Sequence, residues 1–370
     1  MNKKLLAVAL TAACAGVAHA DTNVTLYGLI DVGVGYERIK GDGFHASRFA
    51  EVQNNQNGSR WGLKGTEDLG DGLSAVFVLE NGFGPVDGKL QQSSRMFGRQ
   101  ATLGLDSKSW GRIEFGRQTN MATKMFTAVD PFATNFNSAN MGTTFSALNT
   151  MRLDNLVLYQ TPNLGGFKFG AGYSFNADDT RTDGNGFRTS DNNRSITTGL
   201  SYANGPVYLA ASYDRMNPTD NAVGGQNTAK LSQWALGGYY DFEVLKLHAA
   251  VSQTRDGWFI GQSLATSPGN GYSDLGTYKL ADGFKATSTM VGLTVPMGSS
   301  TALFGSWQRA KPNSDKLTGD DKTFNVYALG ATYAFSKRTN VYAYASYGDN
   351  YAFHDGVTDT AFAIGLRHQF

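Results

Sequence analysis

Apolar and polar residues alternate with a period of two along most of the chain, and this alternation restricts the possible folds more than any other feature. In FKFGAGYSF (167–175), the aromatic residues share one parity with Ala171, while lysine, serine and two glycines take the other. Residues 234–242 and 245–251 repeat the pattern. Because successive side chains of a β-strand point to opposite faces, each stretch predicts a strand with one apolar face.

The connections between these stretches come in two lengths that alternate along the chain. Short turns are predicted at 67–72, 106–109, 162–166, 203–206, 241–244, 296–300 and 335–339. Longer polar connections are predicted at 37–57, 84–94, 120–150, 177–192, 218–229, 257–283, 312–322 and 350–359. Together they would join sixteen strands of roughly ten to twelve residues, which is long enough for a tilted strand to cross a bilayer.

An even number of antiparallel strands, with short turns at one end and long loops at the other, is typical of a transmembrane β-barrel. The sheet has to close, because hydrocarbon cannot hydrogen-bond an open edge. A soluble β-sandwich would share the alternation but gives no reason for the segregated loop lengths. The sequence therefore predicts an all-β fold, a 16-stranded antiparallel transmembrane β-barrel with short periplasmic turns and long extracellular loops.

The N-terminus has the pattern of a secretory signal peptide. Lys3 and Lys4 precede a charge-free stretch, and Ala18-His19-Ala20 is a small-x-small cleavage pattern. The predicted division is a cleaved signal peptide, 1–20, and one barrel domain, 21–370. Cleavage removes the only cysteine and leaves a net charge of about −1, so the sequence predicts neither disulfides nor nucleic-acid binding.

With the strands placed, the chain resembles the general porins of Gram-negative outer membranes, of the betaproteobacterial type. The matching segments are VTLYGLIDVGVGY (24–36), SRWGLKGTEDLGDGLSAVFVLENGF (59–83), FGRQATLGL (97–105), FGRQ (115–118), YANGP (202–206), SKRTNVYAYASY (336–347) and GLRHQF (365–370). The resemblance implies a homotrimer in the cell outer membrane that lets small hydrophilic solutes and ions diffuse through a water-filled channel. It also implies that the third long loop, 120–150, folds into the lumen and narrows it.

Parity predicts which charged residues face the lumen. Arg60, Lys64, Glu80 and Lys168 alternate with apolar residues that take the outer face. A base on the lipid face at the bilayer midplane costs roughly 2–4 kcal/mol, whereas a lumen-facing charge is hydrated. These four residues are therefore predicted to line the pore near its constriction.

Three further arginines are ambiguous by parity. Arg99 and Arg117 share the parity of outward aromatic residues, so either a bulge reverses the register or these strands lie at a trimer contact; Arg152 is similarly unresolved. The resemblance implies basic residues at the pore neck, at Arg60, Arg99 and Arg152, with Arg117 a weaker candidate. Each could instead be an ordinary solvated barrel arginine.

The predicted bases would face Asp130 in the loop and Glu80 on the wall. A field of this kind across the lumen orients water and dipolar solutes, as charged rings do in other pores. Because bases outnumber acids among these residues, the sequence predicts a mild anion preference.

The chain ends in FAIGLRHQF, an apolar-faced strand that stops on Phe370. In a closed barrel this last strand pairs with the first, and a terminal aromatic residue suits the membrane interface. The resemblance implies in addition that Phe370 is part of the signal read by the barrel-assembly machinery. Outer-membrane lipid is the expected surrounding of the outer apolar faces.

Two other functions are compatible with an outer-membrane barrel. A substrate-specific outer-membrane channel would have an ordered aromatic or polar binding cluster in the lumen, which the sequence leaves open. A barrel enzyme would need a nucleophile and base, but the histidines after processing, His45, His248, His354 and His368, suggest no Ser-His-acid set. No phosphate-loop or metal-ligand spacing occurs either. We therefore expect no enzyme activity and no cofactor.

Overall fold

The computed structural model of the chain describes residues 23–178, 188–220, 228–261 and 275–370. The predicted signal peptide lies outside the described residues. The strands are β1 (Asn23–Gly41), β2 (Phe44–Gln53), β3 (Arg60–Gly70), β4 (Leu73–Gly82), β5 (Gln100–Ser107), β6 (Gly111–Thr119), β7 (Arg152–Gln160), β8 (Phe167–Ser174), β9 (Arg194–Asn204), β10 (Val207–Asn217), β11 (Ser232–Asp241), β12 (Lys246–Ile260), β13 (Thr277–Met297), β14 (Thr301–Pro312), β15 (Phe324–Ala334), β16 (Thr339–Asp349) and β17 (Thr358–Gln369).

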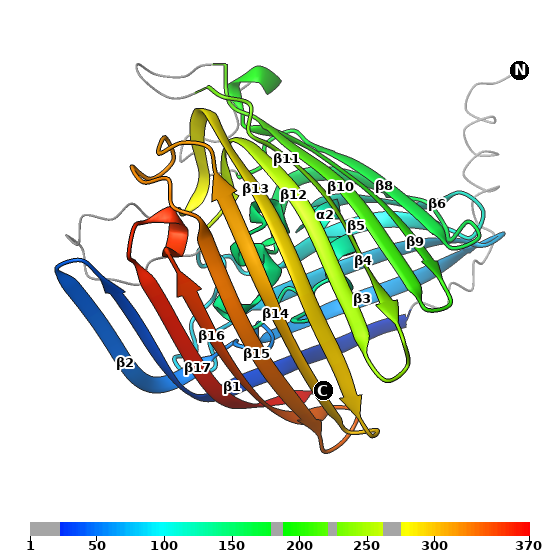
Figure 1. Cartoon of the computed structure of the whole chain (residues 1–370). Helices are drawn as coiled ribbons and strands as arrows, with labels where there is room; N and C mark the ends of the chain where they lie inside the picture. The colour runs from blue at the N-terminus through cyan, green and yellow to red at the C-terminus, as the bar shows by residue number, and fades with distance from the viewer. Residues whose placement is uncertain (1–22, 179–187, 221–227, 262–274) are drawn as a thin grey trace, which may run out of the picture.

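These strands form one closed antiparallel sheet (Figure 1). The sheet closes where β1 pairs with β17, in a register that sets Leu29 opposite Gln369 and Tyr36 opposite Phe362. On its other edge β1 pairs with β2 along its second half and with β3 along its first half. The segments β2 and β3 therefore share one position in the wall, and the barrel has sixteen strands as predicted.

The first long connection differs from the expectation. Residues 37–57 were predicted to be a polar loop, but β1 continues to Gly41 and pairs with β2 through a tight turn. The resulting hairpin projects from the rim of the barrel (Figure 1). Both faces of this hairpin carry polar residues, so its sequence shows no apolar alternation, whereas the hydrogen-bond ladder needs no apolar face.

The two ends of the barrel differ in the length of their connections. Short turns join β3 to β4, β5 to β6 and the later pairs at one end, here called the short-turn end. The other, long-loop end carries the short helices η4 (Thr189–Asp191) and η5 (Tyr351–Phe353). No helix in the described residues has the length and hydrophobicity that a membrane span requires.

The residues between β6 and β7 form the most structured of the long connections, here called the inner loop (120–150). It contains α2 (Met121–Phe126) and three single turns, η1 (Asn137–Ala139), η2 (Met141–Thr143) and η3 (Ser146–Leu148). In Figure 1 the helix α2 lies behind the front wall, within the barrel. Its side chains Met121, Met125 and Phe126 belong to a buried apolar cluster that includes residues of the surrounding strands.

Side chains on the barrel wall separate by face as the alternation predicts. On β1, Val24 and Leu26 are 53% and 61% exposed on the outside, whereas Asp31 is fully buried inside. The C-terminal strand closes the barrel with Phe370, which exchanges backbone hydrogen bonds with Gly28. A Cβ at Gly28 would lie 2.4 Å from the Phe370 ring, so the ring packs directly on the glycine of the first strand.

Candidate functional site

The inner loop is hydrogen-bonded to the inner wall over many strands. Its anchoring bonds are Met121 N–H to Thr197 Oγ1 (2.8 Å), Tyr208 Oη–H to Met125 O (2.8 Å), Gln308 Nε2–H to Ala139 O (2.7 Å), Thr144 Oγ1–H to Gln308 Oε1 (3.1 Å) and Ser146 Oγ–H to Gln233 Oε1 (2.9 Å). These partners lie on β9, β10, β11 and β14. The loop is therefore fixed inside the barrel.

Arginines gather on the wall formed by β3 to β7, and two of them, Arg60 and Arg99, share the carboxylate of Glu80. Arg99 Nε donates to Glu80 Oε1 at 2.7 Å, and Arg60 Nη1 lies 3.9 Å from the same oxygen. The hydroxyl of Tyr27 donates to Glu80 Oε2 at 3.0 Å. The side chains of Arg60, Glu80 and Arg99 are 21%, 13% and 12% exposed. The ion pairs are thus partly shielded from water. Charges interact more strongly in such an environment, because its dielectric constant is lower than that of water.

The structure resolves the ambiguous orientation of Arg99. This residue precedes the first ladder residue of β5, Gln100, although its backbone N–H still bonds to Glu80 O. Free of the strand's strict alternation, its side chain turns to the inner face. There it contacts Glu80, and a Cβ on Gly58 would lie 2.6 Å from Arg99 Nη1.

A bulge explains the inward orientation of Arg117. The β6–β7 register shifts between Gly116 and Gln118. Gly116 has a φ of +119°, and the backbone of any residue with a side chain would be strained at this angle. Arg117 Nη1 donates to Asp154 Oδ1 at 2.6 Å. Arg95, from the preceding loop, donates to the other carboxylate oxygen at 2.6 Å. Neither Arg95 nor Asp154 was singled out from the sequence.

Arg152 lies beside these groups without a carboxylate of its own. Its Nε donates to the carbonyl oxygen of Arg99 at 3.1 Å, and no ion pair joins it to any acid in the described ranges. The set Arg60, Arg99, Arg152 and Glu80, here called the neck cluster, therefore carries more positive than negative charge.

The two predicted lysines lie apart from the neck cluster. Lys64 is further toward the short-turn end of β3, with its ammonium 5.3 Å from the centre of the Tyr27 ring. Lys168 is the second residue of β8, also near the short-turn end, and is exposed. Neither is joined to the neck cluster by a hydrogen bond or ion pair in the described part of the chain.

The expected place of Asp130 is wrong. We expected its carboxylate to face the arginines across the lumen, but it is 3% exposed and turned into the inner loop. Its oxygens accept from the backbone N–H groups of Phe132 (3.0 Å), Thr134 (2.8 Å) and Met141 (3.1 Å). Burial raises the pKa of this carboxyl to about 6, although the three donors act in the opposite direction. Asp130 therefore organises the loop backbone.

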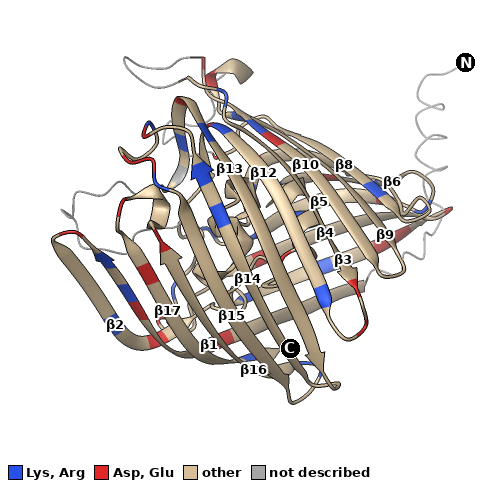
Figure 2. Cartoon of the chain, in the orientation of Figure 1, with Lys and Arg blue, Asp and Glu red and all other residues tan. Residues whose placement is uncertain are grey.

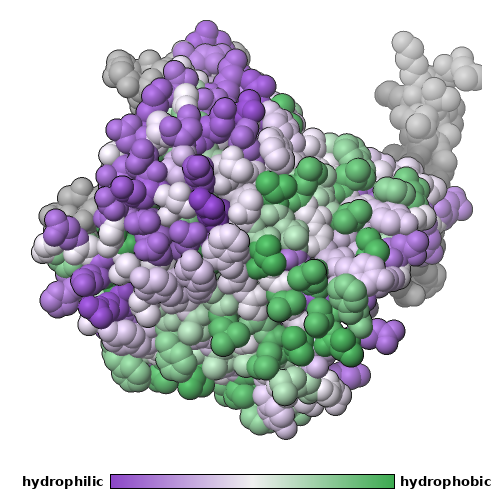
Figure 3. Space-filling model, in the orientation of Figure 1, coloured by the Kyte–Doolittle hydropathy of each residue, from purple (hydrophilic) through white to green (hydrophobic). Residues whose placement is uncertain are grey.

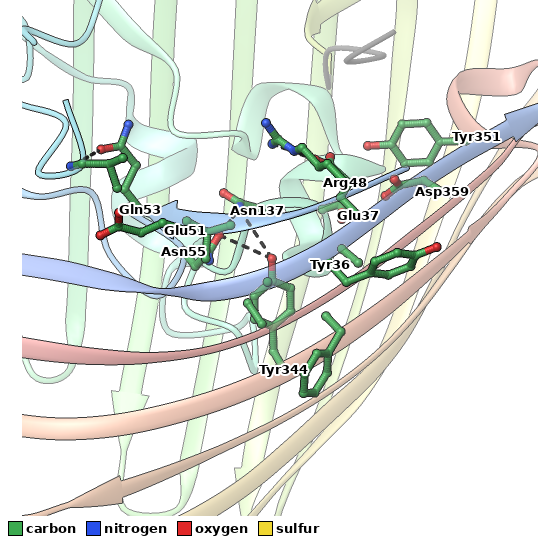
Figure 4. A pocket seen from close by; sticks show the side chains of 17 residues that line it. Tyr36, Glu37, Arg48, Glu51, Gln53, Asn55, Asn137, Tyr344, Tyr351 and Asp359 are labelled. Carbon is green, nitrogen blue, oxygen red and sulfur yellow. Dashed lines mark hydrogen bonds and ion pairs between the residues drawn. The ribbon is translucent and has the colours of Figure 1, made fainter. Parts of the chain in front are cut away.

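Acidic side chains in the lumen gather elsewhere, around a pocket of about 430 Å³ between the inner loop and the wall (Figure 4). Glu37 and Asp359 line it from β1 and β17. Arg48 lies 2.7 Å from Glu37, and Asp359 is buried with one carboxylate oxygen lacking a hydrogen bond. The pocket lies further along β1 toward the long-loop end than the neck cluster, so Glu37 and Asp359 lie at a different level of the barrel from the neck arginines.

The residues that sequence reasoning missed had weak but readable signals. Tyr27 has the inward parity of β1, and Asp154 has the inward parity of β7. The parity of these positions predicts the face of the wall but not the residue that each side chain contacts. The described residues hold no group of three or more metal-ligating side chains. What the neck cluster can do chemically is bind and release anions reversibly, through guanidinium groups suited to carboxylate and phosphate.

The chain is similar to known proteins over its full length. A family profile described as Gram-negative porin matches residues 7–352. An outer membrane porin protein of Bordetella pertussis is 51% identical, and outer membrane porin protein 32 of Delftia acidovorans is 32% identical, each over 100% of both chains. A solved structure, an anion-selective porin from Comamonas acidovorans, has a TM-score of 0.72 and 27% identity, covering 95% of this chain and 100% of that one.

Proposed function

This chain belongs to the Gram-negative porin family, as an outer-membrane channel for small hydrophilic solutes and ions, and we propose that its neck cluster makes the channel anion-preferring. The single observation that carries this proposal is the excess of arginine over carboxylate at Arg60, Arg99, Arg152 and Glu80. Burial of Asp130 in the inner loop strengthens it, since the loop then presents no acid to the arginines.

The proposal predicts the sign of the channel's selectivity. In a planar bilayer with a KCl gradient, the wild-type protein should show a reversal potential displaced toward the chloride equilibrium potential. The displacement should shrink at high salt, because the Debye length falls from about 10 Å at 0.1 M to about 3 Å at 1 M. A reversal potential of zero at low salt, or one displaced toward the potassium equilibrium potential, would contradict the anion preference.

A substrate-specific channel is the second candidate. A polar pocket lined by Glu37, Asn137, Tyr344 and Asp359 favours this function. The pocket brings carboxylates and hydrogen-bonding groups together where a solute could bind. General diffusion and specific binding are separated by concentration dependence. Solute flux through a general channel rises in proportion to concentration, while a binding site causes saturation.

We also propose a homotrimer embedded in outer-membrane lipid and inserted by the barrel-assembly machinery. Supporting it are the large apolar side chains exposed on the outer wall, such as Leu26, Leu103 and Phe115 at 61%, 64% and 51%. Exposed surfaces of this kind need lipid or a neighbouring subunit against them. The N-terminal segment 1–20 is proposed to be removed during export.

Removal of Phe370 should impair assembly far more than conduction. The ring packs on Gly28 where the barrel closes, and the neck cluster lies on other strands. We expect a chain lacking Phe370 to yield little of the heat-modifiable oligomer that unboiled wild-type membranes should show on a denaturing gel. The few channels that form should have wild-type conductance. Normal amounts of that oligomer in the outer membrane would rule out the assembly role.

A further inference from the structure

The polar pocket between the inner loop and the wall contains two buried side-chain atoms that have no hydrogen-bond partner among the described residues. Asp359 is 3% exposed and its Oδ1 accepts no hydrogen bond, and Asn55 is 3% exposed and its Nδ2 donates none. Both residues line the pocket. Buried polar groups are nearly always hydrogen-bonded, so an unpaired acceptor and an unpaired donor in one pocket indicate a polar ligand.

Asp359 also has no positive charge to compensate its own. Arg48 is the only base among the described lining residues, and it lies 2.7 Å from Glu37. Ile39 stands opposite Asp359 in the β1–β17 ladder, so Asp359 shares the inner face with Glu37. Figure 2 shows acidic and basic segments close together in this part of β1, β2 and β17. A buried carboxylate without a counter-charge is costly, and water does not neutralise it, so the pocket favours a cation.

The rest of the pocket offers neutral hydrogen-bonding groups. Asn137 Nδ2 donates to Asn55 Oδ1, and it also lies 3.4 Å from Tyr344 Oη. Figure 4 shows these three side chains together, while Asp359 lies apart from them beside Tyr351 of η5. Amides and phenolic hydroxyls both donate and accept hydrogen bonds, as the hydroxyl groups of a ligand require. One end of the pocket therefore suits a cation and the other end suits hydroxyl groups.

We propose that the polar pocket is a binding site for amino sugars, that is, for small polyhydroxylated solutes with one primary ammonium group. The ammonium group pairs with Asp359, and hydroxyl groups bind Asn55 and its neighbours. The pocket volume of about 430 Å³ lies within the range of small-molecule sites. This inference rests on the proposed channel function and deepens its second candidate, because it names the class of solute that a specific site takes.

The position of the pocket gives such a solute access to it. The pocket lies nearer the long-loop end of the barrel than the neck cluster does. Figure 3 shows a hydrophilic surface around the long-loop end and an apolar surface on the wall below it. A solute that enters from the long-loop end therefore reaches the pocket before it reaches the arginines of the neck.

The test measures the binding of glucosamine to the detergent-purified full-length protein by isothermal titration calorimetry at neutral pH. The variant Asp359→Asn removes the charge and keeps the size of the side chain. Its matched control, Asp315→Asn, removes an exposed carboxylate from the connection between β14 and β15. We expect the variant to lose glucosamine affinity on the order of tenfold, because a hydrogen-bonded ion pair is lost, and the control to bind like the wild type.

Three other solutes separate the parts of the ligand, with the wild-type protein alone. N-acetylglucosamine and glucose keep the hydroxyl groups without the ammonium group, and methylammonium keeps the ammonium group without the hydroxyl groups. Each should bind on the order of tenfold more weakly than glucosamine. No glucosamine binding by the wild type, or equal binding of glucosamine and any one of the three, would overturn the proposal even where the variant failed to fold.

Chloride conductance in planar bilayers distinguishes a failure of this inference from a failure of the channel function. Wild-type conductance of Asp359→Asn would show that the variant is folded. Equal glucosamine affinity of that folded variant and the wild type would then overturn the amino-sugar site and leave the channel in place. Absence of any chloride conductance in the wild type would contradict the channel function itself and, with it, the inference.

Discussion

Replacing Asp130 with alanine should enlarge and destabilise the open channel. The change removes the acceptor for three backbone N–H groups, those of Phe132, Thr134 and Met141. Hydrogen bonds to a charged group contribute about 1.5–3 kcal/mol each, and an unsatisfied buried donor carries a further cost. The segment around η1 and η2 should therefore lose its fixed conformation. Single-channel recordings should show higher conductance with larger current fluctuations.

An asparagine at the same position separates this structural role from an electrostatic one. Asp130→Asn removes the charge but keeps one acceptor oxygen, so the loop should hold its place better than in Asp130→Ala. If Asp130 instead acted as a pore charge, both substitutions would shift the reversal potential toward anions by the same amount and leave conductance noise alone. That result would contradict the buried role.

Neutralising Arg152 should shift ion selectivity more than any other single change at the neck. Arg99 is bound to Glu80, whereas Arg152 has no carboxylate partner in the described residues. A unit charge 4–8 Å from a passing ion contributes about 2–4 kcal/mol at an effective dielectric constant of 20. We therefore expect Arg152→Gln to move the reversal potential in a KCl gradient clearly toward cations, with a smaller shift for Arg60→Gln.

Lys168 supplies the matched control for this experiment. It is also a lumen-parity base, but it lies exposed near the short-turn end, where water and salt screen its charge. Lys168→Gln should leave the reversal potential close to that of the wild type at physiological salt. A shift for Lys168→Gln as large as that for Arg152→Gln would show that the neck cluster is not the source of the selectivity.

The sequence by itself determined the sixteen-stranded barrel. The alternation of apolar and polar residues has to match the alternating directions of the side chains along every strand of the wall. One face meets an apolar surrounding and the other the interior, so a one-residue slip would reverse every side chain. The same rule placed Arg60 and Glu80 on the inner face correctly, since β3 and β4 are regular there. Phe370 could likewise be placed beside the first strand from closure alone.

Parity failed wherever the backbone left the regular ladder. Arg99 lies just outside β5, and Arg117 lies at a bulge with Gly116 at positive φ. In both cases a backbone irregularity of one or two residues turns the side chain inward. The amino-acid composition does not reveal such an irregularity. The hairpin of β1 and β2 was missed for a related reason, since its hydrogen bonds form without an apolar face.

Only the tertiary structure decided what Asp130 does. A charged residue in a loop expected inside a lumen suggests a pore charge, because hydration is the usual way to satisfy a carboxylate. The folded loop offers instead three backbone N–H groups from residues on both sides of η1. Such a set of donors exists only once the loop is closed and anchored to the wall. The sequence determined which residues line the barrel, and the packing of the inner loop decided which charges a solute meets.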